Sequence, residues 1–401
     1  MKTILPLLLG LLLPWAPSAQ SGCTDPQALN YDPAATLNDG SCLYPPTSLS
    51  PDATLVLPEE LSECSGLAWH DATLWSHNDS GNPPTLFQLN PDDGSILDSI
   101  RPPGTSNVDW EDLALGDGFL FVGDFGNNPG NRTDLRILRL PADNPLAHPD
   151  TIAFAFSDQT SFPNAPNAHN FDCEAFFYHD DSLHLFSKNW LDGRTRHYTL
   201  PAQPGQHLAL LQDSLDVGGL LTAAHRLEDG TILLLGYDLD ALEAFLYLLF
   251  DYPPGRIFAG NKRRISLGSL LLTGQTEGIA GPAAEQVYVC SESTPLLPPL
   301  LLRYDLSSFF QPPSQTASRH LAPCRVYPNP GAGALTLELP SHTAPPIRVR
   351  LHQTGRLLRT LTLNGPTPTL QLEDLPPVAG LLWVEVLDSR GYRCLSPVVR
   401  R

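Results

Sequence analysis

The feature that most constrains this 401-residue chain is a unit that recurs between about residues 51 and 310. Each unit has a polar or acidic residue, a short apolar strand, a turn, and a second apolar strand that ends in polar residues. A repeat of roughly 45 to 65 residues with about four short strands is typical of a β-propeller, whose blades cannot bury their faces alone. The first strands of the five visible units begin near Ser65, Glu111, Glu174, Ala223 and Glu277.

The content of proline and glycine favours the same fold class. The chain has 41 prolines and 30 glycines, and proline disfavours long helices because it removes a backbone donor and clashes with the preceding turn. We therefore expect an all-β protein with a five- or six-bladed propeller at 51–310, where the long stretch 143–170 has room for further strands. A strand at 53–57 would complete the last blade and close the ring. A pair of β-sandwiches is the alternative, which fits the recurrence less well.

The charge of the chain restricts its partners. With 24 basic and 43 acidic residues the formal net charge is −19. Nucleic acids and anionic membranes are bound through cationic surfaces, so neither is an expected partner. The balance is compatible with an exported protein or a cation binder.

The N-terminus has the pattern of a secretory signal. Lys2 precedes an apolar run at 4–13, and small residues follow up to Ala19. The run is shorter than the approximately 20 apolar residues that span a bilayer, and no later segment is apolar enough. We expect residues 1–20 to be a signal peptide and the mature protein to be a monomer without a transmembrane span.

Residues 21–50 form a short acidic segment between two cysteines. We expect Cys23 and Cys42 to form a disulfide, which export permits. Two interpretations of the acidic side chains remain open, a Ca²⁺ site and a disulfide-bonded spacer with turn-forming residues. The oxygen donors concerned are Asp25, Asp32, Asn38 and Asp39. The run from Gly22 to Cys42 resembles a small module of secreted and surface proteins of Bacteroidota.

A second small domain is expected after a proline-rich linker at 311–323. Residues 324–401 have the alternation of a small β-sandwich of short strands. The Val326-Tyr327-Pro328-Asn329-Pro330 start, the Thr354-Gly355-Arg356 turn and the basic end resemble the type A sorting domain of the type IX secretion system. That resemblance implies the type IX machinery as a partner, and with it passage through the periplasm to the outer-membrane surface or the extracellular space. Cys324 and Cys394 lie at the two ends of this domain, and the sequence leaves open whether they form a disulfide with each other.

The middle of the chain also carries motifs of known propellers. They include Ser62–Ala68, His77–Asn82, Asp109–Ala114 and Gly123–Asn128. These motifs are similar to those of exported Bacteroidota propellers and, more distantly, of the SdiA-regulated and esterase-like phytase propellers. The resemblance supports the fold, whereas an activity has to be argued from the site, because propellers host many unrelated functions.

The geometry of a propeller predicts where the polar ends of the strands meet. The first strand of a blade lines the central channel and the second strand runs back antiparallel to it. The starts of first strands and the ends of second strands therefore share one mouth of the channel. The starts carry Glu63, Glu111, Glu174 and Glu277, and the ends carry Asp79, Asp124, Lys188 and Glu292. Asp109, Asp172, Asn78, Asn127 and Asn189 are close to these in sequence.

Several carboxylates at one mouth repel one another, so they need a metal ion, protons or backbone donors. Oxygen ligands favour Ca²⁺ or Mg²⁺ over zinc, and Ca²⁺ is the expected cofactor. The candidate metal ligands are Glu111, Glu174, Glu277 and Asp124. The candidate ligand-binding residues are Glu63, Asp79, Asp124, Lys188, Glu277 and Glu292.

Three functions remain open from the sequence. The first is an exported propeller that binds an extracellular ligand through its acidic, Ca²⁺-bound mouth. The second is a metal-dependent phosphoester or ester hydrolase of the phytase-like kind, with Glu111, Glu174 and Lys188 as catalytic candidates and Lys188 stabilising negative charge. The third is an adhesion or protein-interaction module whose glutamates only tie neighbouring blades together.

Overall fold

A computed structural model describes residues 19–310, 324–328, 334–339, 345, 347–353, 356–363, 365, 369–372, 380–387 and 393–400. Residues 1–18 of the expected signal peptide and the whole expected linker lie outside these ranges. The fold is all-β, as predicted. In the described part, α1 (Leu270–Thr273) is the one α-helix, and η1 (Glu59–Leu61), η2 (Ile257–Ala259) and η3 (Ser307–Phe309) are short 3-10 turns. Within these same ranges, no helix combines the length and the apolar character needed to cross a bilayer.

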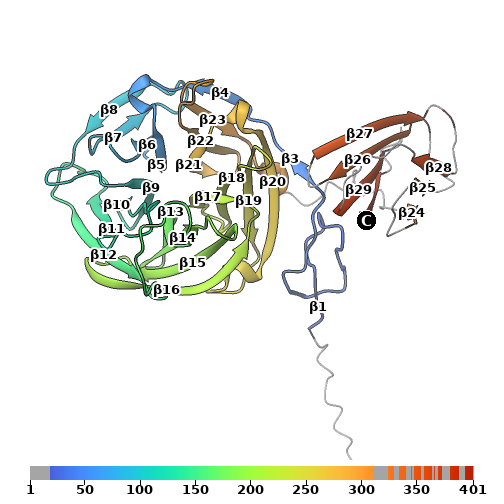
Figure 1. Cartoon of the computed structure of the whole chain (residues 1–401), viewed down its shortest axis with the longest axis horizontal. Coiled ribbons are helices and arrows are strands. Elements are labelled where there is room, and N and C mark those ends of the chain that lie inside the picture. The colour runs from blue at the N-terminus through green and yellow to red at the C-terminus, as the bar shows by residue number, and fades with distance from the viewer. Residues whose placement is uncertain are drawn as a thin grey trace, which may run out of the picture.

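The strands of 51–310 surround a common centre in the arrangement of a β-propeller (Figure 1). In this described stretch they fall into five groups of four antiparallel strands, called units one to five here. Unit one has β5 (Cys64–His70), β6 (Thr73–Asn78), β7 (Leu86–Leu89) and β8 (Ile96–Ile100). Unit two has β9 (Trp110–Gly116), β10 (Phe119–Asp124), β11 (Arg136–Pro141) and β12 (Asp150–Phe156), and unit three has β13 (Asp172–His179), β14 (Ser182–Lys188), β15 (Arg194–Pro201) and β16 (Gly205–Asp216). Unit four has β17 (Leu220–Arg226), β18 (Ile232–Asp238), β19 (Glu243–Phe250) and β20 (Asn261–Ser269), and unit five has β21 (Thr276–Ala283), β22 (Gln286–Ser291), β23 (Leu300–Tyr304) and β4 (Ala53–Val56).

The ring closes through both ends of the repeat region. The innermost strands β5, β9, β13, β17 and β21 contact one another in a closed circle. The N-terminal strand β4 pairs antiparallel with β23 and so completes unit five. Within the long stretch 143–170, β12 is the outermost strand of unit two, and it pairs in parallel with β16 of unit three.

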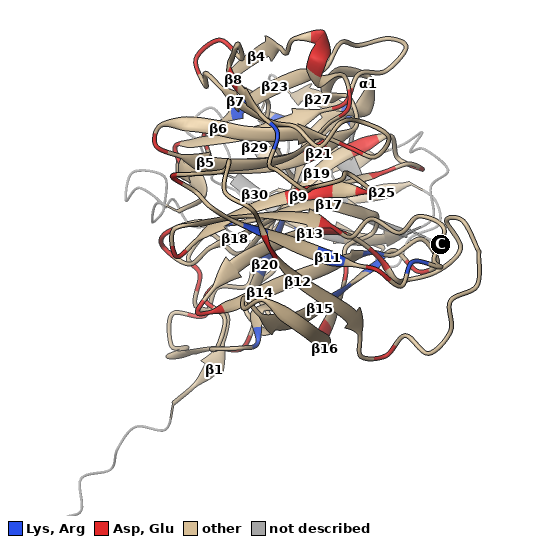
Figure 2. Ribbon diagram, turned by 90° about the vertical axis from the view of Figure 1, so that its left-hand side faces the viewer, with Lys and Arg blue, Asp and Glu red and all other residues tan. Residues whose placement is uncertain are grey.

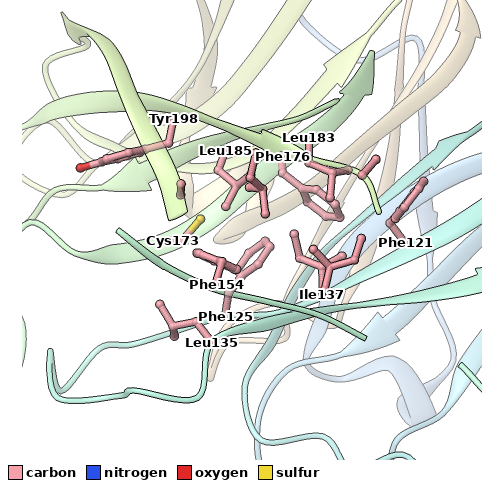
Figure 3. Packing of buried hydrophobic residues seen from close by; sticks show 14 of the residues in the cluster. Phe121, Phe125, Leu135, Ile137, Phe154, Cys173, Phe176, Leu183, Leu185 and Tyr198 are labelled. Carbon is pink, nitrogen blue, oxygen red and sulfur yellow. The ribbon is translucent and has the colours of Figure 1, made fainter. Parts of the chain in front are cut away.

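Apolar side chains fill the spaces between neighbouring units. Between units two and three, Phe125 and Phe154 of one face Phe176 and Tyr198 of the other (Figure 3). The rings of Phe125 and Phe176 meet edge to face at 5.3 Å between centroids, a favoured aromatic geometry. Since each sheet buries both faces against its neighbours, no unit has a complete core of its own.

The acidic module before the ring packs on unit four. Cys23 and Cys42 form the expected disulfide. The short strands β1 (Ser21–Gly22) and β2 (Leu37–Asn38) pair with each other, and β3 (Thr47–Ser48) pairs with β20. Arg263 of β20 donates a 2.7 Å hydrogen bond to Gln27. The module thus packs against the outer edge of the ring through both backbone pairing and side-chain hydrogen bonds.

The four oxygen donors of this module act within their own turns. Each side chain accepts a hydrogen bond from the backbone N–H two residues further on, the geometry of an Asx turn. The acceptors are Asp25, Asp32, Asn38 and Asp39. These contacts correspond to the spacer interpretation of the segment.

The C-terminal part has two sheets. One has β24 (Arg325–Tyr327), β25 (Leu335–Glu338) and β28 (Thr369–Leu372), and the other has β26 (Ile347–Gln353), β27 (Arg356–Leu363), β29 (Gly380–Leu387) and β30 (Arg393–Arg400). They share a core that includes Leu337, Val349 and Val384. Cys324 is disulfide-bonded, whereas the side chain of Cys394, for which pairing with Cys324 was left open, lies outside the described ones. Pro330 and the Thr354-Gly355 turn also lie outside.

Candidate functional site at the channel mouth

A β-bulge interrupts the first part of every innermost strand. In units two, three and five the residue left out of the pairing is Glu111, Glu174 and Glu277 respectively, while unit four has Thr222 there and unit one has Ser65 and Gly66. A bulge re-aims the side chain that it carries and is common beside binding sites. In Figure 2 acidic segments, in red, lie near the labels of the innermost strands β9 and β21. The three glutamates therefore occupy equivalent positions at one mouth.

One half of the mouth contains its own cation. Lys188, at the end of β14, places its Nζ 2.5 Å from Oε2 of Glu174. The same Nζ lies 5.3 Å from the ring centroid of Trp190 and 5.5 Å from that of Tyr237. Burial alone would lower the pKa of Lys188, but Glu174 and the carboxylates around it raise that pKa well above its usual value. The ammonium group stays charged, and we call this half the lysine half.

Unit five places two more carboxyl groups beside the lysine half. Gln275 donates a 2.6 Å hydrogen bond to Glu277 and a 3.4 Å bond to Glu292. Burial, then the nearby charge of Glu277, raises the pKa of Glu292 to about 8. The charge of Lys188 also lowers the pKa values of Glu277 and Glu292, against the effect of burial.

The other half gathers three carboxylates that form no salt bridge within the described structure, although the more distant charges of Lys188 and Arg132 oppose the rise in the pKa values of Asp79 and Asp109 respectively. Asp79, Asp109 and Glu111 each offer an oxygen atom, and these atoms lie within 4.8 Å of one another. Among the described residues, no salt bridge reaches any of the three. Burial, then the charge of Asp79, raises the pKa of Asp109 to about 7, and burial, then the charge of Glu174, raises that of Glu111 well above its usual value. We call these three residues the acidic triad.

Glu111 is the member of the triad that most clearly points to a ligand. Its side chain is only 5% exposed, and its Oε1 atom has no hydrogen-bond partner within the described structure. Gly126 leaves the space for it, because a Cβ at that position would lie 1.9 Å from Oε1 of Glu111 and 2.6 Å from Oδ2 of Asp109. Buried polar atoms nearly always have a partner, so this oxygen is prepared for a bound group.

Further buried polar atoms without partners come from the same ends of the strands. Asn78 and Ser291 end second strands, Asn189 follows one, and Thr276 opens the innermost strand of unit five. Within the described structure the atoms without partners are Oδ1 of Asn78, both amide atoms of Asn189, Oγ1 of Thr276 and Oγ of Ser291. The mouth therefore offers oxygen and amide groups beyond the triad.

Other residues predicted for the site have structural partners. Asp124 pairs with Arg132 at 3.1 Å and with Arg136 at 2.7 Å. Asp172 accepts bonds from the indole of Trp190 and the backbone of Asn127. These two carboxylates are already neutralised or bonded, so we leave them out of the proposed cation site.

Glu63 lies exposed at the edge of the mouth, where Asn82 donates to its carboxylate. Asp112 was not singled out from the sequence. Its buried carboxyl accepts backbone hydrogen bonds from Leu113, Phe176 and Ala224 and thereby ties three innermost strands together. No sequence signal distinguishes it from the neighbouring Glu111, because the bulge alone decides which of the two faces the mouth.

A second acidic cluster lies outside the mouth. His70, Asp71 and Asp143 come together at the protein surface, where both aspartates are exposed. It has no buried atom that lacks a partner, and exposed acidic groups gather without a bound ion. It serves below as a control for the triad.

Comparisons with known proteins do not assign a family. No family model matches the sequence, and no curated protein matches it. Among solved structures, an exo-β-1,3-galactanase from Phanerochaete chrysosporium is 11% identical, with a TM-score of 0.41 over 91% of this chain and 97% of that chain. The calcium-binding protein regucalcin from Agrobacterium tumefaciens is 13% identical, with a TM-score of 0.35 over 65% of this chain and 96% of that chain. A luciferin-regenerating enzyme is 12% identical, with a TM-score of 0.36 over 63% and 94%. At this level of similarity they carry no inference about the site.

Proposed function

We propose that this protein is an exported five-bladed β-propeller that binds a divalent cation, with Ca²⁺ preferred, at Asp79, Asp109 and Glu111. The cation and the polar groups around it would then hold an extracellular ligand. The observation that carries the proposal is the buried Oε1 of Glu111, which has no hydrogen-bond partner in the described structure, beside two further carboxylates that form no salt bridge there.

The donor set fits Ca²⁺ in charge and in chemistry. Ca²⁺ takes six to eight oxygen ligands, often carboxylates, amide carbonyls and water. The triad offers three carboxylates, and the Oδ1 atom of Asn78 is a further buried oxygen near the end of the strand that precedes Asp79. A divalent cation would replace the protons that the raised pKa values of Asp109 and Glu111 otherwise retain.

We also propose export by the type IX system. The signal-like N-terminus, the β-sandwich proposed for 324–401 and the Tyr327-Pro328 start of that domain support it. The ligand-binding mouth would then act at the outer-membrane surface or outside the cell. Deleting residues 324–401 should leave the chain in the periplasm if this proposal holds.

A hydrolytic function is the second candidate, and one observation favours it. In this function Asp109 would not bind the cation, because a carboxyl whose pKa is raised to about 7 can accept a proton at neutral pH, as a general base must. A metal-dependent hydrolase would hydrolyse p-nitrophenyl phosphate or p-nitrophenyl acetate, and Asp109→Asn would abolish that turnover. If the protein binds the cation but hydrolyses neither substrate, only the binding function remains supported.

The test of cation binding is calorimetric titration of the full chain with CaCl₂ after treatment with EDTA. We expect one saturable site, and we expect Glu111→Gln to weaken its affinity by about tenfold or more, the loss of one charged ligand. The matched control is Asp143→Asn, which removes one carboxylate from the exposed surface cluster and should leave the affinity unchanged. No saturable heat, or equal effects of both variants, would contradict the proposal.

A further inference from the structure

Two buried cysteines meet where the ring closes. Cys64 begins β5 in unit one and Cys290 lies in β22 of unit five, 226 residues later. The Sγ atom of Cys290 is 3.0 Å from the carbonyl oxygen of Ser65 and 3.8 Å from that of Cys64. The Sγ atom of Cys64 lies 3.1 Å from Oγ of Ser76, and the interaction between the two thiols helps to raise the pKa of the Cys290 thiol. Both belong to one core cluster and are fully buried.

The backbone around the two thiols is closely packed. A Cβ at Gly278 would lie 2.3 Å from the carbonyl oxygen of Ser65 and 2.8 Å from Sγ of Cys290. The glycine thus allows β21 to approach β5 closely at the height of the two sulfur atoms. Otherwise β4, which the chain connects to unit one, is held to the rest of unit five by its pairing with β23 and by packing, which are noncovalent.

We propose that Cys64 and Cys290 form a disulfide bond in the exported protein, which fastens unit one to unit five. The chain carries disulfides elsewhere, at Cys23–Cys42 and at Cys324, as an oxidising compartment permits. The step joins the two sulfur atoms and removes one hydrogen from each. Two electrons and two protons pass to a disulfide-bearing oxidant, either glutathione disulfide or a thiol–disulfide oxidoreductase, which is reduced to two thiols.

The burial of both sulfur atoms places this step before the ring is complete. Burial raises the pKa of the Cys290 thiol well above its usual value, so the folded thiol is a poor nucleophile. Before unit one packs against unit five, both thiols are open to the oxidant, and folding then brings them together. The bond would close a long loop, and a disulfide stabilises more when it restricts a longer loop of the unfolded chain.

The bond also bears on the mouth. Cys64 follows Glu63, and Cys290 precedes Ser291 and Glu292. A covalent link at this height would hold the polar groups of unit five beside those of unit one.

The first test is a peptide map of the full chain refolded in a glutathione redox buffer. The protein is denatured without a reductant, alkylated with iodoacetamide and digested. We expect Cys64 and Cys290 in one cross-linked peptide pair that is two hydrogens lighter than the sum of its parts. Cys173, which is buried in a different core cluster, should be alkylated. Complete alkylation of both Cys64 and Cys290 would overturn the proposal.

The second test measures the melting temperature in oxidising and reducing buffer. Reductant also opens Cys23–Cys42, so wild type is compared with Cys64→Ala/Cys290→Ala and with the control Cys173→Ala. We expect the double variant to lose several degrees in oxidising buffer and to respond less to reductant than wild type, whereas the control responds fully. An equal response of all three proteins would overturn the proposal.

Discussion

The two halves of the mouth carry buried carboxylates that are neutralised in different ways. In the lysine half, Glu174 contacts the ammonium group of Lys188. In the acidic triad, no salt bridge among the described residues reaches Asp109 or Glu111, and burial together with neighbouring carboxylates raises the pKa of both. Burial raises the pKa of Glu174 as well, although there the charge of Lys188 opposes the shift. A buried charge is costly unless it is paired, so the protein must supply each half with positive charge from somewhere.

The difference separates a permanent part of the mouth from a responsive part. The charge of Lys188 is part of the chain and does not depend on the solution. The triad takes its positive charge from protons at low pH or from a bound cation at higher pH. Only the triad should therefore respond to the concentration of Ca²⁺. Three experiments test this difference between the two halves.

The largest effect is expected from Lys188→Met, which removes the permanent cation. Glu174 would be left buried without its partner, and breaking a buried pair costs about 3 to 5 kcal/mol. Urea unfolding near neutral pH should show this loss. Arg256→Met, which removes an exposed cation, should change the free energy of unfolding little. Adding Glu174→Gln to Lys188→Met should recover part of the loss, and an unchanged stability of Lys188→Met would contradict the role of the lysine.

A second, intermediate effect is expected from Gly126→Ala. The new methyl group would lie 1.9 Å from Oε1 of Glu111, so one of them must move. Since the lysine half does not touch this glycine, the ring should still fold, while Ca²⁺ affinity falls by about tenfold or more, as for the loss of a ligand. Circular dichroism and calorimetric titration would measure the two outcomes. Unchanged affinity in a folded variant would place the cation elsewhere.

The third effect is the dependence of Ca²⁺ affinity on pH. The pKa of Asp109 is raised from 3.8 to about 7, so its carboxyl must release a proton when a cation binds below that pH. Affinity should therefore rise severalfold from about pH 6 to about pH 8 and then level off. In the cation-free protein the sign is opposite, because the folded state holds the extra proton and loses stability as the pH rises from about 4 to about 7. A flat affinity profile would show that Asp109 does not bind the cation.

The sequence predicted which strand ends lie at the same mouth better than it predicted which side chains contact one another there. The repeated pattern placed Glu111, Glu174 and Glu277 at one mouth, and the bulges put all three at equivalent positions. Alternation along a strand has a period of two residues, so it cannot show where an extra residue is inserted. The pattern therefore could not show that Asp112, the neighbour of Glu111, turns away from the mouth and accepts backbone hydrogen bonds.

The repeated sequence pattern did not predict which charged side chains form ion pairs. Lys188 was expected to stabilise an anionic substrate, whereas it contacts Glu174. Asp124 was expected to bind a metal, whereas Arg132 and Arg136, which follow in the loop and in the next strand, hold its carboxylate. Such pairings depend on the course of the loop at 125–135, and a loop has no periodicity from which to predict them.

The central claim is that the cation binds at the triad and not in the lysine half. The most direct test is a crystal structure of the full chain grown with Ca²⁺ and with Mn²⁺ as an anomalous scatterer. The account predicts one anomalous peak within bonding distance of Asp79, Asp109 and Glu111, with Lys188 still in contact with Glu174. A peak between Glu174 and Glu277, or no peak at a saturating cation concentration, would contradict it.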